Sequence, residues 1–278
     1  MKYLKKIIAG VSIVAIMLAY PNTAIAALIY GNALNFNGTT QTSRSVLNAG
    51  STVTDNFSMT CWVNVTAYPA SSNGFVMDNG ANDARGMGLF VSTAGVVRAD
   101  YSFVAAVDSG YTLSTQTWYH IGVIRSAGVS QFYVNGTAQG ATITNAPNAG
   151  GDYISVGSGV ISTGAFNNYL NAKTDDCRFY ERAITSSEIL QLYNNGNKWT
   201  YTDISSANLL YWYKFDESSG TNVSDSSGNS KNLTTTNSPT WVTGIVAIGS
   251  VTSTTTTMLT MNGAGNITFT GNGNTIIN

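Results

Sequence analysis

The stretch that decides the fold is residues 117–136, which read TWYHIGVIRSAGVSQFYVNG. Its first half, up to Arg125, mixes aromatic and β-branched residues, which suit a pleated and half-buried surface. Its second half alternates side chains from Val129 onward and ends at Asn135-Gly136, a dipeptide that favours a tight hairpin turn. The stretch therefore predicts two long antiparallel strands, with a third formed by the residues that follow Gly136.

The first 26 residues have the pattern of a secretory signal peptide. Three lysines within the first six residues precede an apolar run over residues 7–19, and the segment ends in Ala24-Ile25-Ala26. A basic head, a short apolar body and an Ala-x-Ala end predict export, with cleavage after Ala26. The alternative is a retained membrane anchor, although the run is shorter than the roughly 20 apolar residues that span a bilayer. The expected location is the cell envelope or the extracellular space, with no stable membrane insertion after cleavage.

The charge balance argues against a nucleic-acid partner. Without residues 1–26, 10 basic residues stand against 14 acidic ones, a net charge of −4. No basic cluster remains that could follow a phosphate backbone. Charged residues make up only 10% of the chain, while Gly, Ser, Thr and Asn are abundant. This composition is typical of short strands joined by many turns.

Alternating runs elsewhere predict further strands, among them Phe57–Val65. The spacing of about ten residues between runs, with turn signals between them, is typical of an all-β sandwich. One helix is expected after the last core strand, because Thr185 and Glu188 have the spacing of a capping box. Ile189 and Leu192 then recur at helical spacing. We expect this helix to be a short lid on the edge of the sandwich.

Cys61 and Cys177 are the only two cysteines. In an exported protein a single pair predicts a disulfide. The alternative is two buried free thiols, whereas a metal site around them is not expected because the chain has only one histidine.

The order of these blocks resembles the laminin G-like jelly roll of the concanavalin A-like lectin/glucanase superfamily. The resemblance covers residues 28–196 and is carried by five blocks in this order: residues 33–38, ALNFNG; residues 57–63, with Cys61-Trp62-Val63; Trp118-Tyr119-His120; Tyr133-Val134-Asn135-Gly136; and residues 175–189, DDCRFYERAITSSEI. It implies a two-sheet antiparallel jelly-roll sandwich with one short helix after the last core strand. It also implies that Phe57–Val65 lies beside residues 174–180, which would bring Cys61 and Cys177 within bonding distance. The resemblance is a poor guide to activity, because the family contains binders, adhesins and accessory modules of enzymes.

The expected domain plan has four parts: a signal peptide over residues 1–26, a jelly roll over 27–197, a linker over 198–207 and a strand segment over 208–278. In the laminin G-like family a block resembling residues 212–229 usually precedes the jelly roll. We therefore expect the strand at residues 209–215 to dock on the jelly roll. The alternative is a partial second module, and residues 251–257 are either a linker or an extra strand.

No catalytic residue is expected. His120 lies within a strand-like run, where a core or sheet-face role is expected. Glycoside hydrolysis needs two facing carboxylates, and the chain has only three glutamates, Glu181, Glu188 and Glu217, with no motif that pairs them.

Ligand binding is the better prospect. Asp78, Asp83 and Asp152 offer the hard oxygen ligands that Ca²⁺ prefers, although such residues are also ordinary turn formers. Calcium is the only cofactor that the sequence indicates. A binding surface for a ligand could be lined by four tyrosines, which could instead belong to the core: Tyr101, Tyr111, Tyr153 and Tyr169.

The resulting hypothesis is a secreted, non-catalytic module that binds a glycan or a cell-surface protein. The first alternative is a structural module of a surface layer, appendage or adhesin, and a second is a glycoside hydrolase. The oligomeric state is left open.

Overall fold

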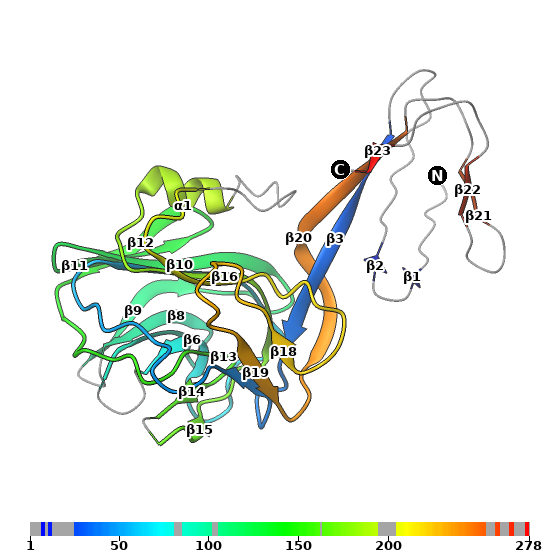
Figure 1. The fold of residues 1–278 in the computed structure, drawn as a ribbon. Coiled ribbons are helices and arrows are strands. Elements are labelled where there is room, and N and C mark those ends of the chain that lie inside the picture. The colour runs from blue at the N-terminus through cyan, green and yellow to red at the C-terminus, as the bar shows by residue number, and fades with distance from the viewer. Residues whose placement is uncertain are drawn as a thin grey trace.

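The computed structural model describes residues 7–8, 11–12, 25–80, 85–101, 105–161, 163–193, 204–253, 259–261, 267–269 and 276–277. Two large antiparallel sheets face one another across a common core (Figure 1). The predicted all-β, two-sheet jelly-roll sandwich is confirmed.

The larger sheet has nine strands, and it contains the stretch that decided the prediction. In spatial order its strands are β12 (Thr137–Ile143), β11 (Val129–Val134), β10 (Trp118–Ser126), β5 (Phe57–Val65), β16 (Ala172–Tyr180), β3 (Ile25–Asn35), β20 (Thr240–Ser253) and β23 (Ile276–Ile277), with β17 (Leu209–Tyr213) also paired to β16. The predicted hairpin is present, since Val134 pairs with Thr137. Asn135 and Gly136 take φ angles of 51° and 74°, as the tight turn requires.

The smaller sheet has eight strands. In spatial order they are β18 (Asn222–Val223), β19 (Leu233–Thr236), β4 (Thr42–Arg44), β13 (Ser155–Val156), β6 (Gly74–Asn79), β7 (Met87–Val91), β8 (Val96–Tyr101) and β9 (Ala105–Thr112). Three two-stranded pairs lie outside the large sheets: β1 (Ile7–Ile8) with β2 (Val11–Ser12), β14 (Gly159–Val160) with β15 (Phe166–Asn167), and β21 (Leu259–Met261) with β22 (Ile267–Phe269).

The core lies between the two sheets. Alternate side chains of a strand point to opposite faces, and the inward set of β5 includes Phe57, Met59 and Cys61, all fully buried. Cys61 forms a disulfide with Cys177 of the neighbouring strand β16. The predicted cysteine pairing is therefore confirmed.

The helix α1 (Ser186–Tyr193) begins with the predicted capping box. The Thr185 hydroxyl accepts a hydrogen bond from the Glu188 N–H at 3.1 Å, and the Glu188 carboxylate accepts one from the Thr185 N–H at 2.7 Å. The Arg182 guanidinium binds the same carboxylate and helps to lower the pKa of Glu188 to about 2.

The helix covers the outer face of the larger sheet, not the sandwich edge as the sequence predicted (Figure 1). Its Ile189 and Leu192 pack with Ile124 and Tyr180, which point away from the main core. Without the helix, Ile124 and Tyr180 would be exposed to water on that face. Burying them against Ile189 and Leu192 places the helix there.

The segment after the helix adds strands to both sheets. β17 pairs with β16, and β20 pairs with β3, so both extend the larger sheet. β18 and β19 extend the smaller sheet, in which β19 pairs with β4 and β18 is the edge strand. Residues 198–203 of the expected linker and residues 254–257 of the Thr-rich segment lie outside the described residues.

A long ribbon formed by β3 and β20 leaves the sandwich (Figure 1). β16 pairs with β3 only at Leu34 and Asn35, whereas β20 follows β3 as far as Ile25. The predicted cleavage point after Ala26 lies near the start of β3. No helix in the described part of the chain is long and apolar enough to cross a membrane.

Candidate functional site

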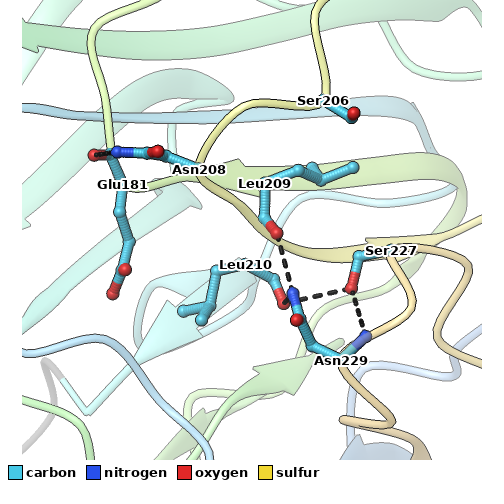
Figure 2. A pocket seen from close by; sticks show the side chains of 7 residues that line it. All are labelled: Glu181, Ser206, Asn208, Leu209, Leu210, Ser227 and Asn229. Atoms are coloured by element: carbon cyan, nitrogen blue, oxygen red, sulfur yellow. Dashed lines mark hydrogen bonds between the residues drawn. The ribbon is translucent and has the colours of Figure 1, made fainter.

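A polar pocket opens where β16 ends and β17 begins (Figure 2). Its volume is about 480 Å³, which is within the range of small-molecule sites. It is lined by one carboxylate, two amides, two hydroxyls and two leucines: Glu181, Asn208, Asn229, Ser206, Ser227, Leu209 and Leu210.

Three hydrogen bonds hold Glu181 in place, one to its carboxylate and two to its backbone. The Ser51 hydroxyl donates to Glu181 Oε1 at 2.6 Å. The Glu181 N–H donates to the Asn208 carbonyl at 2.7 Å, and the Asn208 amide returns a hydrogen bond to the Glu181 carbonyl at 3.3 Å. The start of β17 is thereby fixed against the end of β16, and Glu181 is set at the wall of the pocket.

The opposite wall is a turn organised by Asp225. Its carboxylate accepts hydrogen bonds from the backbone N–H groups of Trp212, Ser227 and Lys231 at 2.9–3.0 Å. Figure 2 shows the Asn229 amide directed at β17, where it donates to the carbonyls of Leu209 and Leu210. The sequence assigned these residues to the strand segment over 208–278 and did not predict their part in a pocket. The dense Asp-Ser-Ser-Gly-Asn run was the only available signal.

Charged groups of both signs lie near the pocket. Arg182, next to Glu181, donates to the carbonyls of Ser205 and Ala207 at 2.9 and 3.0 Å, on either side of the pocket residue Ser206. Tyr211 on β17 is fully buried, and burial is the main cause that raises its pKa well above its ordinary value, with further contributions from Asp78, Asp225 and Glu181.

Two of the three residues of the predicted calcium site, Asp78 and Asp152, are described, and both carboxylates bind other groups of the protein. Asp78 is buried on β6 and accepts a hydrogen bond from the Val160 N–H at 2.7 Å, while Asp152 forms an ion pair with Arg85 at 2.8 Å. Asp83 lies outside the described residues. Within those residues, no three or more His, Cys, Asp or Glu side chains are grouped to hold a metal ion. These two carboxylates alone do not fit a calcium site, and a site that includes Asp83 stays a prediction.

The four tyrosines that the sequence nominated do not form one surface. Tyr101 is fully buried, with its ring 6.3 Å from that of Phe57, and burial raises its pKa to about 12. Its assignment to a binding surface was therefore wrong, because its position on β8 points into the core. Tyr111, Tyr153 and Tyr169 are half-buried. Tyr111 lies beside Tyr119, and the Tyr153 ring lies 4.8 Å from the Arg44 guanidinium.

His120 and the other glutamates lie apart from the pocket lining. His120 is buried, its ring lies 5.3 Å from that of Trp62, and burial lowers its pKa to about 4. Glu188 caps the helix, and Glu217 accepts a hydrogen bond from the Ser224 N–H at 2.7 Å. Glu181 is thus the one glutamate that lines the pocket.

A buried carboxylate on β16 links the jelly roll to the projecting ribbon. Asp175 is fully buried, and its Oδ2 accepts hydrogen bonds from the Ile245 and Val246 N–H groups of β20 at 2.8 and 3.1 Å. Among the described groups, its Oδ1 has no hydrogen-bond partner. Burial, together with the charges of Asp176 and Asp216, raises the pKa of Asp175 well above its ordinary value.

Replacing this carboxylate with an amide is expected to stabilise the protein at neutral pH. A raised pKa in the folded state means that stability falls as the pH rises above the ordinary aspartate value. Asp175→Asn keeps an acceptor for the two N–H groups and removes the charge, so we expect about 1 kcal/mol of added stability at pH 7. The gain should shrink toward pH 4, as measured by thermal unfolding at both values.

Asp108→Asn is the matched control for this experiment, because it removes an exposed carboxylate from the edge strand β9. A variant D175N that loses stability at pH 7 but not at pH 4 would show that the charged form is the stabilising one.

The family model described as the concanavalin A-like lectin/glucanases superfamily matches residues 37–190, more than half of the chain. No curated protein sequence matches the chain. A solved protein from Bacteroides ovatus, to which carbohydrate binding has been ascribed, has a TM-score of 0.55 and 16% identity, and the match covers 83% of this chain and 72% of that one.

Two further solved structures are more distant. A heptameric SAP-like pentraxin from Limulus polyphemus has a TM-score of 0.46 and 15% identity, over 59% of this chain and 82% of that one. Domain 4 of a GH43 extracellular arabinanase from Geobacillus stearothermophilus, in complex with arabinotriose, has a TM-score of 0.40 and 18% identity, over 66% and 81%. With the family match, the jelly-roll topology and the sequence blocks in agreement, the chain belongs to the laminin G-like group of the concanavalin A-like lectin/glucanases superfamily.

Proposed function

We propose that this protein is a secreted, non-catalytic module that binds neutral carbohydrate in the pocket between β16 and β17. The observation that carries the proposal is the pocket lining, to which five polar residues contribute: Glu181, Asn208, Asn229, Ser206 and Ser227 (Figure 2). Sugar hydroxyls both donate and accept hydrogen bonds, and this set of groups can serve both roles. The carbohydrate binding ascribed to the fold relative from Bacteroides ovatus is in keeping with this proposal.

The non-catalytic part of the proposal follows from the number of carboxylates in the pocket. Most glycosidases place two carboxyl groups on either side of the scissile bond. Among the residues that line this pocket, Glu181 supplies one, and its Oε1 is engaged by Ser51. An arrangement with one restrained carboxylate supports binding to hydroxyls more readily than acid–base hydrolysis.

Two features support secretion. The first 26 residues have the signal-peptide pattern. The Cys61–Cys177 disulfide suits an oxidising compartment, because disulfides persist in secreted and periplasmic proteins.

Removing the charge of the pocket carboxylate is expected to weaken sugar binding. In Glu181→Gln the side chain keeps its shape but loses acceptor strength, so we expect a loss of affinity of roughly tenfold, or about 1.4 kcal/mol. The measurement is titration calorimetry on neutral oligosaccharides that a glycan array selects. Asp108→Asn, which changes the net charge equally on β9, should bind as the unaltered protein does. Equal affinity of all three proteins would overturn the assignment of the pocket.

The same preparation tests catalysis and calcium. Reducing-sugar release from the bound polysaccharide, lost in E181Q, would contradict the non-catalytic proposal.

Loss of binding on adding EDTA, restored by Ca²⁺, would support a calcium site that includes Asp83.

A second candidate function is self-assembly through the ribbon of β3 and β20. Along β3, β16 covers only Leu34 and Asn35, and no other described strand pairs with the remainder of that edge. Residues 25–33 and 242–253 contain no charged residue and no proline. Proteins usually protect an exposed strand edge with charged residues or proline. An edge without them favours pairing with another chain.

A charge placed in the ribbon is expected to prevent such pairing. We expect the unaltered protein to associate in a concentration-dependent manner in sedimentation experiments, and Ile29→Lys to remain monomeric. Val129→Lys is the control, because Val129 is 41% exposed on the sandwich itself. A monomeric unaltered protein at every concentration would exclude this candidate.

A further inference from the structure

Three tyrosines gather around one turn at the end of the sandwich away from the pocket. The turn follows β9 and includes Leu113 and Ser114. The Tyr68 hydroxyl donates to the Leu113 carbonyl at 2.6 Å, and the Tyr119 hydroxyl accepts a hydrogen bond from the Ser114 N–H at 3.4 Å. The Tyr111 ring lies 6.0 Å from the Tyr119 ring in an edge-to-face arrangement. We call Tyr68, Tyr111 and Tyr119 the tyrosine rim.

The tyrosine rim is partly open to solvent. Tyr68 is 37% exposed, and Tyr111 and Tyr119 are half-buried. The Tyr68 ring lies against the β7–β8 turn at Gly95, where a Cβ atom would come within 2.5 Å of the ring. Gly95 also has a φ of 77°, so a larger residue there would be both strained and in collision with the ring. The backbone at Gly95 is thus shaped to hold one side of Tyr68 while much of the side chain remains accessible.

The segments that contribute to the tyrosine rim carry no charged residue. Residues 66–74, 92–95 and 111–119 contain no Asp, Glu, Lys or Arg. Burial and the neighbouring Tyr119 raise the pKa of Tyr111. Aromatic faces next to hydroxyls, without charge, suit the apolar C–H face of a neutral sugar ring better than an ionic ligand.

The tyrosine rim and the pocket are too far apart to be one site. Tyr119 and Thr174 both pair with Val63, so the rim is level with Thr174, seven residues before Glu181 along β16. At about 3.3 Å per residue, and with a bulge between, this separation is roughly 20 Å. A short sugar in the pocket would therefore not reach the tyrosine rim.

We propose that the tyrosine rim is a second carbohydrate site, for the C–H face of a neutral sugar ring, and that the module is therefore bivalent. This inference rests on the proposed function, because the same class of ligand is assigned to both ends. Two sites at opposite ends of a rigid sandwich would let one molecule bridge two polysaccharide chains and gain avidity.

Amide chemical shifts of the full mature protein can locate each binding event. Short neutral oligosaccharides of glucose, mannose, xylose or arabinose serve as probes. The N–H groups of Gly95 and Ser114 report on the tyrosine rim, and those of Asn208 and Ser227 report on the pocket. We expect one sugar class to shift both sets, and we expect the unaltered protein to precipitate the corresponding polysaccharide by cross-linking it.

Single variants test each site separately. At Tyr68 they also distinguish the contribution of the ring from that of the hydroxyl. Tyr68→Ala should weaken the shifts at the tyrosine rim by roughly tenfold in affinity and leave the pocket unchanged. Tyr68→Phe, which keeps the ring, should retain most of the binding. The control Tyr153→Ala removes another half-buried tyrosine, beside Arg44, and should change neither site. Either Y68A or E181Q should raise the protein concentration that cross-linking requires.

The outcomes distinguish this inference from the proposed function. Shifts at the pocket alone, unaffected by Y68A, would overturn the second site and leave the pocket in place. Shifts at the tyrosine rim alone, unaffected by E181Q, would support the rim and overturn the pocket. No shift at either set with any probe would overturn both.

Discussion

Replacing both cysteines with alanine (C61A/C177A) is expected to lower the free energy of unfolding by about 4 kcal/mol. The bond joins residues 116 positions apart, so its loss restores much conformational freedom to the unfolded chain. Because both side chains are fully buried among apolar neighbours, alanine leaves only a small cavity and no unsatisfied polar atom. The effect should therefore come mainly from the lost cross-link.

Chemical denaturation of the oxidised protein, the reduced protein and C61A/C177A measures this effect. The reduced protein should lose nearly as much stability as the double variant, since the cross-link is absent from both. A difference of less than about 1 kcal/mol between oxidised and reduced protein would contradict the expectation. It would also show that pairing of β5 with β16 holds the larger sheet together without the bond.

Local patterns in the sequence predicted much of this fold correctly. The strand and hairpin signals of residues 117–136 correspond to β10, β11 and the turn that joins β11 to β12. The spacing of Thr185 and Glu188 predicted the helix cap, whose hydrogen bonds are both present. These features succeed because the interactions that fix them lie within a few residues of one another.

Features that depend on pairing between distant segments were harder to predict. Alternation shows that a strand has two faces but not which one is inward, and for that reason Tyr101 was placed on a surface. The helix was assigned to an edge because the apolar outer positions Ile124 and Tyr180 could not be recognised before the sheet order was known. The tyrosine rim likewise joins a loop after β5 to a turn after β9.

The pocket is the clearest example of a feature that depends on pairing between distant segments. Glu181 directly follows one strand, and Asn229 belongs to a turn 48 positions later in the chain. Only the pairing of β16 with β17 brings them to one site. The sequence contained each of these residues in an ordinary turn or strand context, so nothing in the local pattern distinguished them from other polar residues.

Replacing Tyr211 with alanine is expected to cost about 3–5 kcal/mol of stability, the usual loss when a large buried aromatic side chain is truncated. Tyr211 lies on β17, and its ring centroid is 5.2 Å from those of both Phe179 and Tyr213. It is fully buried in the common core. If the segment after the helix completes the jelly roll, the variant should unfold in a single transition that moves to lower temperature as a whole.

Tyr211→Phe is the matched control, because it keeps the ring and removes only the hydroxyl. That hydroxyl is buried and has no hydrogen-bond partner among the described groups, so its removal should be neutral or slightly stabilising. Leu190→Ala, at a side chain that is 42% exposed on the helix, should change stability little. Two separate transitions in calorimetry, with only one shifted by Y211A, would mean that residues 208–278 form a partial second module. A single shifted transition would mean that the late strand β17 supplies part of the same core that β5 and β16 begin, and the pocket at their junction would then depend on that docking.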